Sequence, residues 1–365
     1  MNAVARHARR VHTLRTCCIP LVLGLVVLTG CGQSAPVPQA PISATRTVVD
    51  MTGRSVQIPA NVTRVATDYP ALDATMLLLG AADRIVATSP GVGPLFQTLD
   101  PPFKNVAMPF DSTLANANVE ALLATRPQVV LLSPSARVLL PTFQRVGIPA
   151  LVFASFQDPT QLKAGVTAVA NVLGGSAIAR AQQFATYYDA NIAQVQAKTA
   201  GIPPVSQPKV YYTAGNPLQT EGQGSIVDFW MNEGGGQNVA AVNGINTAPA
   251  FVTVTLEDVL KWNPDIIVCR DPATKPQILA DPRWSAVSAV RNNRVYVNPS
   301  GVYVWSVRSA ESALEPLWAA KTFHPDLFPN LDVANEVKKF YAQFYSCQLS
   351  DQQVNAILNP VKGPS

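Results

Sequence analysis

The hydrophobic pattern divides the chain into an apolar leader, a long alternation of short strands and helices, and one long helix near the middle. That helix is expected over 176–198, because Ser176 can cap a first turn after two glycines and Pro203 follows its end. Apolar residues recur along it at three- and four-residue spacing, which predicts one buried face. They are Ile178, Ala181, Ala185, Tyr188, Ile192 and Val195. A helix of roughly 35 Å can act as a rigid strut between two domains, and an ordinary core helix of one large domain is the alternative.

On both sides of this helix, β-branched strands alternate with helices. Before it, we expect a hairpin at 47–58, strands at 64–67, 85–88, 128–132 and 150–153, and helices at 72–79, 119–124 and 138–146. After it, we expect strands at 209–213, 265–269 and 294–297, helices at 225–233, 256–260 and 277–287, and three more helices beyond Ser309. Such alternation predicts parallel sheets covered on both faces. The expected fold is therefore α/β, with two Rossmann-like lobes joined by a single long helix.

The N-terminal leader has the pattern of a secretory signal. Four arginines within the first 15 residues precede an apolar run, 19–28, that is too short to cross a bilayer as a permanent helix. The run closes on Leu28-Thr29-Gly30-Cys31, which resembles the lipobox of bacterial lipoproteins. The resemblance implies cleavage before Cys31 and a lipid on that residue, and a plain secretory signal with an incidental cysteine is the alternative.

The proline-rich stretch after Cys31 is expected to be a tether. The expected organisation is a signal peptide at 1–30, a flexible tether at 31–46, an N-terminal lobe at 47–175, the connecting helix at 176–198, and a C-terminal lobe with a helical tail at 199–365.

Removal of the leader changes the charge of the protein. The full chain has 27 basic and 23 acidic residues, and the leader carries four arginines and no acidic residue, so the mature chain is formally neutral. No basic run interleaved with aromatics remains, and nucleic-acid binding is not expected.

Beyond the leader and Cys31, two cysteines remain. Cys269 and Cys347 can form a disulfide or remain free thiols.

Ligands of open parallel sheets bind beyond the carboxyl ends of the strands. The loops expected there, 68–70, 89–91, 133–135, 214–216, 270–271 and 302–305, offer aromatic rings, hydroxyls and a few charges. Such residues suit the binding of a small molecule. The candidate ligand-binding residues are Tyr69, Ser89, Ser133, Asn216, Tyr303, Trp305 and Arg308. The tyrosines can stack on a ligand, ligate haem iron or simply pack at the cleft edge, and Arg308 can bind an anion or pair with Glu311.

Enzyme motifs are missing from the mature sequence. It has no G-x-S-x-G, G-x-x-x-x-G-K, G-x-G-x-x-G or C-x-x-C motif. His324 is the single histidine beyond the leader, which disfavours a bare metal site built on several imidazoles. We therefore expect a protein that is not an enzyme, with no cofactor and no side chains that ligate a metal directly. Any bound metal is expected to arrive within a chelate.

The order and spacing of several short segments resemble one family along the whole mature chain. These segments are 48–54, 64–65 with 79–86, 118–122 with 126–127, 235–239, 256–260 with 263–267, 318–321 with 324–325, and 340–341. They resemble the class III periplasmic-binding proteins, the lipoprotein receptors that deliver iron-siderophores, haem or cobalamin to ABC importers.

The resemblance implies that Glu120 and Glu257, one on each lobe, form salt bridges with arginines of a permease dimer. From the sequence alone, each is also a first-turn glutamate that favours the helix dipole. Several relatives have an acidic-basic pair directly after the tryptophan of the last cleft loop, whereas here Trp305 is followed by Ser306, Val307 and only then Arg308. That departure leaves the ligand open.

The resemblance thus implies an extracytoplasmic, monomeric solute-binding lipoprotein, anchored to a bacterial membrane, that serves an ABC permease dimer and its ATPase. An iron-siderophore complex is the first expectation for the ligand. Haem, cobalamin and a molybdate-type oxyanion are alternatives, and so is a non-transport sensor on the same fold.

Overall fold

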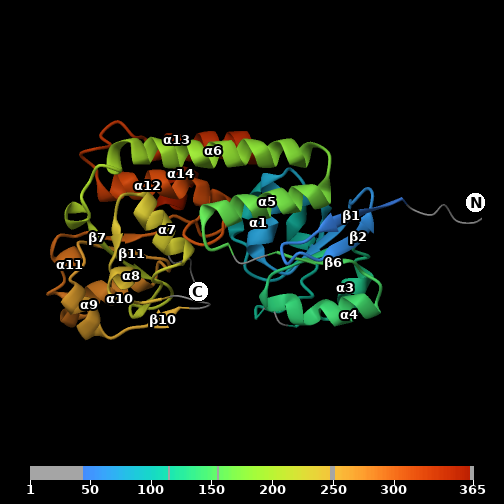
Figure 1. The fold of residues 1–365 in the computed structure, drawn as a ribbon, viewed down its shortest axis with the longest axis horizontal. Helices are drawn as coiled ribbons and strands as arrows, with labels where there is room; N and C mark the ends of the chain where they lie inside the picture. Colours follow the sequence, from blue (N-terminus) through green and yellow to red (C-terminus); the bar gives the residue numbers. More distant parts are fainter. Residues whose placement is uncertain (1–43, 114–115, 154–155, 247–250, 362–365) are drawn as a thin grey trace, which may run out of the picture. The chain divides into compact units, whose positions relative to one another are not determined.

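A computed structural model describes residues 44–113, 116–153, 156–246 and 251–361, and this part of the chain forms two α/β lobes (Figure 1). The expected signal peptide and Cys31 lie outside the described residues. The first strand, β1 (Thr45–Val49), begins within the segment expected to be a tether, and it pairs with β2 (Ser55–Pro59) in an antiparallel hairpin. No helix among the described residues is both long enough and apolar enough to cross a membrane.

Each lobe contains a four-stranded parallel sheet, and the two sheets have the same strand order. The N-terminal sheet runs β4 (Ile85–Ala87), β3 (Val65–Thr67), β5 (Val129–Leu132), β6 (Ala150–Val152). The C-terminal sheet runs β9 (Gln237–Asn238), β7 (Lys209–Thr213), β11 (Ile266–Cys269), β12 (Val295–Val297). All residues of β5 and β11 are buried, which explains their continuous apolar sequences. The expected α/β fold with parallel sheets is confirmed.

Helices cover both faces of each sheet (Figure 1). The N-terminal lobe contains α1 (Pro70–Leu78), α2 (Pro94–Leu99), α3 (Val119–Ala124), α4 (Leu140–Arg145) and α5 (Pro159–Leu173). The C-terminal lobe contains α7 (Ile226–Glu233), α8 (Val239–Val242), α9 (Leu256–Trp262), α10 (Thr274–Ala280), α11 (Ser288–Arg291), α12 (Glu315–Phe323), α13 (Val333–Tyr345) and α14 (Asp351–Leu358). Short 3-10 turns occupy Ala82–Arg84, Pro101–Asn105, Ser135–Leu139, Pro204–Ser206, Pro282–Trp284 and Ala310–Leu314, and β8 (Gln219–Thr220) pairs with β10 (Val252–Thr253).

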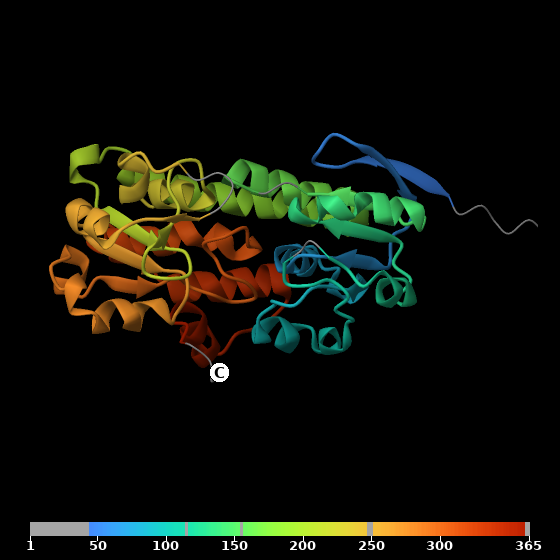
Figure 2. The same cartoon turned by 90° about the horizontal axis from the view of Figure 1, so that it is seen from below.

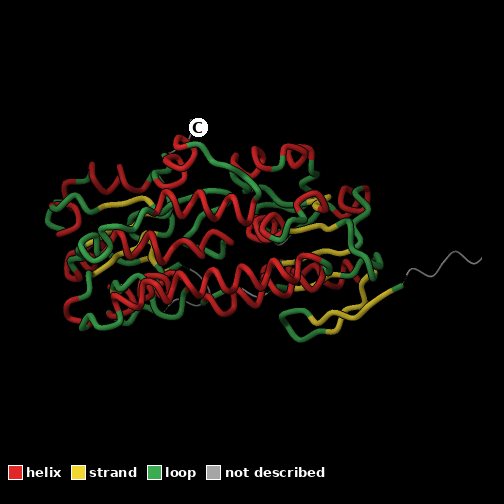
Figure 3. Tube along the Cα trace, turned by 90° about the horizontal axis from the view of Figure 1, so that it is seen from above, coloured by secondary structure: helices red, strands yellow, loops and turns green. Residues whose placement is uncertain are grey.

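The connecting helix α6 covers Ser176–Thr199 and is uninterrupted over its 24 residues, as the long red helix of Figure 3 shows. Its buried face includes the expected Ala181, Tyr188 and Val195 but differs elsewhere. Ile178 is 43% exposed, while Phe184 and Asn191 are buried. The reason is tertiary: the Asn191 amide donates a 2.8 Å hydrogen bond to the carbonyl oxygen of Ala313, so a polar residue belongs to the packed side of the helix.

A second element, α13, joins the lobes beside α6. Figure 2 shows the red C-terminal helices reaching the blue N-terminal lobe, where α13 packs against α1. Arg180 of α6 donates to the carbonyl oxygens of Leu78, at the end of α1, and of Phe344 in α13. Rings of α6 and α13 also meet, with Tyr187 and Phe344 centroids 5.5 Å apart. The lobes are therefore held by a layer of two helices and share one hydrophobic core.

Arginines close the C-terminal ends of four helices. Arg46 donates to carbonyls at the end of α5, Arg64 at the end of α3, Arg180 at the end of α1 and Arg294 at the end of α12. These carbonyls have no partner within their own helix, so the guanidinium groups satisfy them. Such arginines serve the fold and are not free to bind a ligand.

The two cysteines of the described chain do not form a disulfide. Cys269 is buried in β11 and Cys347 is partly exposed after α13, and both are free thiols. Of the two alternatives left by the sequence, the structure has the unpaired one.

Candidate functional site

A cavity of about 480 Å³ lies where the strand ends of the two lobes meet. Its lining comes from both lobes: Tyr69, Leu72, Ser112, Ser133, Pro134, Ser135, Phe153 and Phe156 from the first, and Phe251, Arg270, Tyr303, Val307 and Arg308 from the second. Tyr69, Ser133, Phe153 and Arg270 follow closely on strands β3, β5, β6 and β11. The site therefore lies beyond the carboxyl ends of parallel strands, as expected for this architecture.

Two tyrosines from opposite lobes meet in this cavity. The rings of Tyr69 and Tyr303 stand edge to face, with centroids 6.1 Å apart. The backbone N–H of Tyr303 donates a 2.9 Å hydrogen bond to the carboxylate of Glu311, which is fully buried. Burial and the neighbouring Tyr69 raise the pKa of the Tyr303 phenol, so it stays a neutral hydrogen-bond donor. The aromatic pair thus forms a fixed contact between the lobes.

Two arginines bring positive charge into the cavity. Arg270 lies over the Phe251 ring at 5.2 Å, and Arg308 has a left-handed backbone with φ 53°. Neither forms an ion pair with a described residue, and the Nε of Arg308 is buried with no described hydrogen-bond partner. The alternative pairing of Arg308 with Glu311 is therefore absent from the described structure. Backbone strain and an unsatisfied buried donor concentrate at functional sites.

One buried carboxylate balances part of this charge. Glu221 is 4% exposed; burial raises its pKa, and the positive charges of Arg308 and Arg270 act in the opposite direction. No oxygen of Glu221 lies within ion-pair distance of either guanidinium. Two cations and one carboxylate leave the C-terminal side of the cavity positive, and this field favours an anionic ligand.

The N-terminal side carries hydroxyls instead. Asp68, which is fully buried, accepts the N–H of Ser133 at 2.7 Å and its hydroxyl at 2.5 Å. Burial raises the pKa of Asp68 to about 6, although the hydrogen bonds from Ser133 lower it. Behind it, Asp73 of α1 accepts the hydroxyls of Thr67 and Thr88, and burial raises the pKa of Asp73 to about 8. Asp68 therefore holds the serine that lines the cavity, while Asp73 is occupied by the two threonines.

The structure brings four of the seven candidate ligand-binding residues together. Tyr69, Ser133, Tyr303 and Arg308 line the cavity, whereas Ser89, Asn216 and Trp305 do not. Ser89 and Trp305 are fully buried, and Trp305 belongs to the core shared by the lobes. Asn216 is exposed and accepts the N–H of Leu218 at 3.0 Å, so it shapes a turn.

Several lining residues were not among the candidates. Arg270 lies in an expected loop and directly follows the apolar strand 265–269, a position that could have identified it. Ser135 likewise lies in an expected loop, shortly after the apolar strand β5. Ser112, Phe156 and Phe251 lie away from the expected loops, and the sequence carries no local signal for them.

Glu120 and Glu257 occupy matching positions in the two lobes. Each is exposed in the first turn of a short helix, α3 or α9, and neither forms an ion pair with a described residue. In both lobes the helix is followed by a left-handed residue, a proline and the third strand of the sheet, β5 or β11. Ser133 and Arg270 are the residues directly after these strands, so they too are equivalent.

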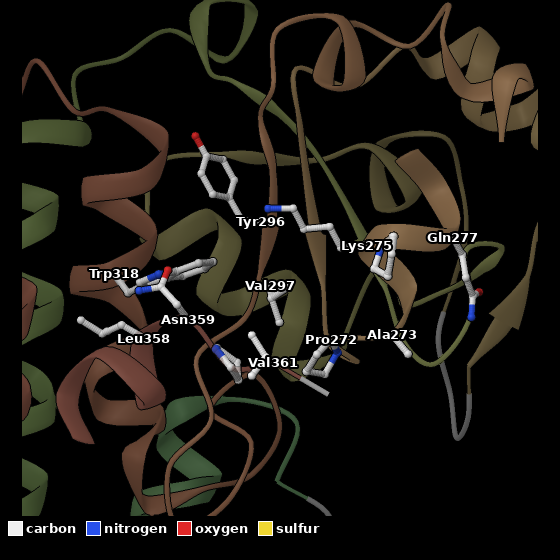
Figure 4. A pocket seen from close by; sticks show the side chains of 12 residues that line it. Pro272, Ala273, Lys275, Gln277, Tyr296, Val297, Trp318, Leu358, Asn359 and Val361 are labelled. Atoms are coloured by element: carbon white, nitrogen blue, oxygen red, sulfur yellow. The ribbon is translucent and has the colours of Figure 1, made fainter. Parts of the chain in front are cut away.

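A second, larger cavity of about 660 Å³ lies within the C-terminal lobe. Figure 4 shows Pro272 and Lys275 on one side of it and Trp318 and Leu358 on the other. Lys275 is the one charged residue in its lining, and the remaining residues are largely apolar. Because the N-terminal lobe contributes nothing to this cavity, the cavity between the lobes is the better candidate for the site.

The described residues contain no group of three or more His, Cys, Asp or Glu side chains placed to hold a metal ion. The His324 ring instead contacts the carbonyl oxygen of Gly235 at 2.9 Å. The cavity thus suits a polar or anionic ligand better than a bare cation.

Comparison with known proteins agrees with this architecture. Residues 65–301 match the periplasmic binding protein family. The chain belongs to that family. The molybdate-binding protein MolA of Haemophilus influenzae is 29% identical over 332 residues, covering 83% of this chain and 91% of MolA. The uncharacterized ABC transporter substrate-binding lipoprotein YvrC of Bacillus subtilis is 24% identical, covering 84% of this chain and 96% of YvrC.

Solved structures show the same fold. A periplasmic solute binding protein from Veillonella parvula has a TM-score of 0.75 and 26% identity, with 86% of this chain and 97% of that chain covered. MolA with bound molybdate has a TM-score of 0.75 and 26% identity, with 84% and 99% covered. The expected class III family and fold are confirmed. This periplasmic binding protein is an extracytoplasmic solute-binding component of an ABC importer and not an enzyme.

Proposed function

We propose that this periplasmic binding protein captures a molybdate-type oxyanion and delivers it to its permease. The observation that carries the proposal is the pair of arginines without ion-pair partners among the described residues, Arg270 and Arg308, in one cavity. Guanidinium groups offer several N–H donors in a fixed plane, and they bind oxyanions through charge-assisted hydrogen bonds. The similarity to MolA, whose name and structure specify molybdate, supports the same ligand class.

An iron-siderophore complex, the first expectation from the sequence, is the second candidate. The aromatic wall of Phe153, Phe156 and Phe251 and the cavity volume of about 480 Å³ favour it. That volume lies in the range of about 300–1,000 Å³ typical of sites for larger molecules. A tetrahedral oxyanion would occupy part of the cavity, with water filling the rest. Haem and cobalamin remain as further candidate ligands.

The docking and anchoring assignments are part of the same proposal. Glu120 and Glu257 would meet arginines of the permease dimer, because each is a solvent-accessible carboxylate at an equivalent place on its lobe. Cys31 would carry the lipid that anchors a monomeric receptor to a bacterial membrane, and the lipobox-like Leu28-Thr29-Gly30-Cys31 supports this. Replacing Cys31 with serine should abolish labelling by a palmitate analogue. Unchanged labelling would contradict the anchor.

A titration of the purified soluble protein tests the ligand. Intrinsic tryptophan fluorescence is followed while molybdate, sulfate, ferric siderophores, haem and cobalamin are added one at a time. Molybdate should bind, and Arg308→Gln should weaken it by about tenfold to a hundredfold, since a hydrogen bond to a charged group contributes about 1.5–3 kcal/mol. Arg283→Gln is the matched control, because Arg283 is exposed and pairs with Asp281. Binding of a ferric siderophore but not of molybdate would favour the second candidate.

A further inference from the structure

The hydroxyl of Ser133 is committed to a buried carboxylate. Ser133 lines the cavity, and Asp68 accepts both of its donors, the backbone N–H at 2.7 Å and the Oγ hydrogen at 2.5 Å. A serine hydroxyl has one hydrogen and two lone pairs. While Asp68 is ionised, that hydrogen points at the carboxylate. Ser133 Oγ then offers a ligand only lone pairs.

An oxyanion cannot use such a group. Its oxygens are acceptors, so they would face the lone pairs of Ser133 and the negative charge of Asp68 in a poorly hydrated place. Protonation of Asp68 removes both conflicts. The carboxyl O–H donates to Ser133 Oγ, the other carboxyl oxygen still accepts the Ser133 N–H, and the hydroxyl hydrogen of Ser133 becomes free to turn toward the ligand.

Resting on the proposed oxyanion function, we propose that binding of the oxyanion is coupled to the uptake of one proton by Asp68, which turns Ser133 from an acceptor into a donor. The proton comes from the solvent and ends on a carboxyl oxygen of Asp68. The oxyanion binds without any change in its own bonds. Asp68 is therefore a positioning residue that acts through Ser133.

The groups around Asp68 are consistent with this role. Asp73 of α1 also lies close to it, and the two oxygens of Asp73 are occupied by the hydroxyls of Thr67 and Thr88. Tyr69 follows Asp68 in the chain and faces Tyr303. Across the cavity lie the charged groups of Arg270 and Arg308. Among these groups, Asp68 alone is hydrogen-bonded to a hydroxyl that lines the cavity.

The sign of the pH dependence follows from linkage. Burial raises the pKa of Asp68 in the free protein to about 6, and the oxyanion raises it further because it favours the neutral form. Below the free pKa, Asp68 is already protonated, so the affinity is constant. Above it, the affinity falls by up to about tenfold per pH unit until the pKa of the complex is reached.

Calorimetric titration with molybdate tests the coupling. Wild-type protein is titrated between about pH 6 and about pH 8, a range that runs upward from the pKa of free Asp68, in two buffers with different ionisation enthalpies. We expect net proton uptake that approaches one proton at the upper pH and an affinity that falls with rising pH. The free oxyanion stays a dianion over this range, so it does not supply the dependence.

Three variants identify the group that takes up the proton. Asp68→Asn places an amide donor on Ser133 Oγ and keeps an acceptor for its N–H, so its affinity should be independent of pH and above wild type at the upper end. Ser133→Ala should bind more weakly than wild type at the lower end and depend less on pH, because the hydroxyl donor is gone while the charge of Asp68 remains. Asp73→Asn is the matched control, since it removes a buried carboxyl group that does not bond to Ser133. It should retain the wild-type slope.

Every outcome of these titrations either supports or contradicts the coupling. Equal wild-type affinity at both pH values, or a slope retained in Asp68→Asn, overturns the coupling and leaves the oxyanion function standing. Loss of the slope in Asp73→Asn, with the full wild-type slope retained in Ser133→Ala, assigns the proton to Asp73 and also overturns the coupling. If molybdate binds at no pH, the proposed function fails and the coupling fails with it. Should Asp68→Asn not fold, Ser133→Ala and the proton count still decide.

Discussion

The two lobes follow the same path and place different chemistry in the cavity. In each, a short helix with a first-turn glutamate leads through a left-handed residue and a proline into the third strand, β5 or β11. The residue after the strand is Ser133 in one lobe and Arg270 in the other. At the helix start the residue type is the same in both lobes, as Glu120 and Glu257. The scaffold therefore decides where a side chain lies, and the residue type decides what it binds.

The partners of these residues sharpen the comparison. Ser133 is held by the buried Asp68, whereas the guanidinium of Arg270 lies over the face of Phe251 and forms no ion pair with a described residue. Other arginines, such as Arg46 and Arg294, are satisfied by helix carbonyls. An arginine without such partners, next to a cavity, retains its donors for a ligand. The same residue type thus serves the fold in one place and the site in another.

The largest expected effect is on transport, and it tests the two positions at which the lobes carry the same residue type. Replacing both Glu120 and Glu257 with alanine should abolish transport while affinity and stability stay near wild type. Exposed carboxylates contribute under about 1 kcal/mol each to folding, whereas deleting one partner of a desolvated interface pair costs about 2–5 kcal/mol. Uptake of the ligand by cells carrying the permease measures the effect.

The control for docking is Asp326→Ala, which removes an exposed acid elsewhere on the C-terminal lobe. The single variants should each reduce uptake if the lobes are used equally. A double variant that supports uptake at the wild-type rate would contradict the assignment of both carboxylates.

The next largest effect is on ligand affinity, and it tests the loops after β5 and β11, where the lobes carry different residue types. Arg270→Gln should weaken oxyanion binding by about tenfold or more, because it removes a charge-assisted hydrogen bond. Ser135→Ala, on the N-terminal side, should change affinity only a few-fold at most, since Ser135 is exposed to water. Equilibrium titration of both variants measures the difference. Equal losses would show that the cationic side has no special part in binding.

A smaller effect concerns buried carboxyl groups in the C-terminal lobe. Glu315 is fully buried with one oxygen lacking a described partner, and burial raises its pKa to about 8. The folded state therefore binds more protons than the unfolded state between about pH 4.5, the ordinary pKa of a glutamate, and about pH 8. The contribution of Glu315 to the free energy of unfolding should be fully present below this window and be lost as pH rises through it.

Glu315→Gln keeps an acceptor for Asn298 and removes the charge. It should be more stable than wild type by about 1–3 kcal/mol at pH 8, the scale of an unsatisfied buried group, and nearly equal to it at low pH. Urea unfolding at both pH values measures the change. Equal destabilisation at both values would show that the carboxyl group is not strained by burial.

The smallest expected effect is the movement of the lobes themselves. Because α6 is continuous and α13 lies beside it, closure on the ligand would require bending packed helices. Small-angle scattering with and without ligand should give nearly the same radius of gyration. A large contraction would show that the two lobes are not held as a pair by these helices.

The sequence by itself determined the elements and the family. Helix α3 covers the expected 119–124, β5 and β11 lie within their expected segments, and α6 extends one residue beyond the expected 176–198. Local signals suffice here, because caps, prolines and apolar periodicity act within a few residues. The segment expected as one helix at 277–287 is broken instead, since Pro282 interrupts it and begins a 3-10 turn.

Only the tertiary structure decided which side chains line the cavity. Trp305 and Arg308 lie three residues apart in one loop, yet Trp305 is buried in the core and Arg308 lines the cavity from a left-handed backbone. The hydrogen bonds of Ser133 to Asp68 join residues 65 positions apart. The direction of a loop side chain depends on such distant contacts, which no local pattern contains, and the chemistry of the site was therefore set by the packing of the two lobes.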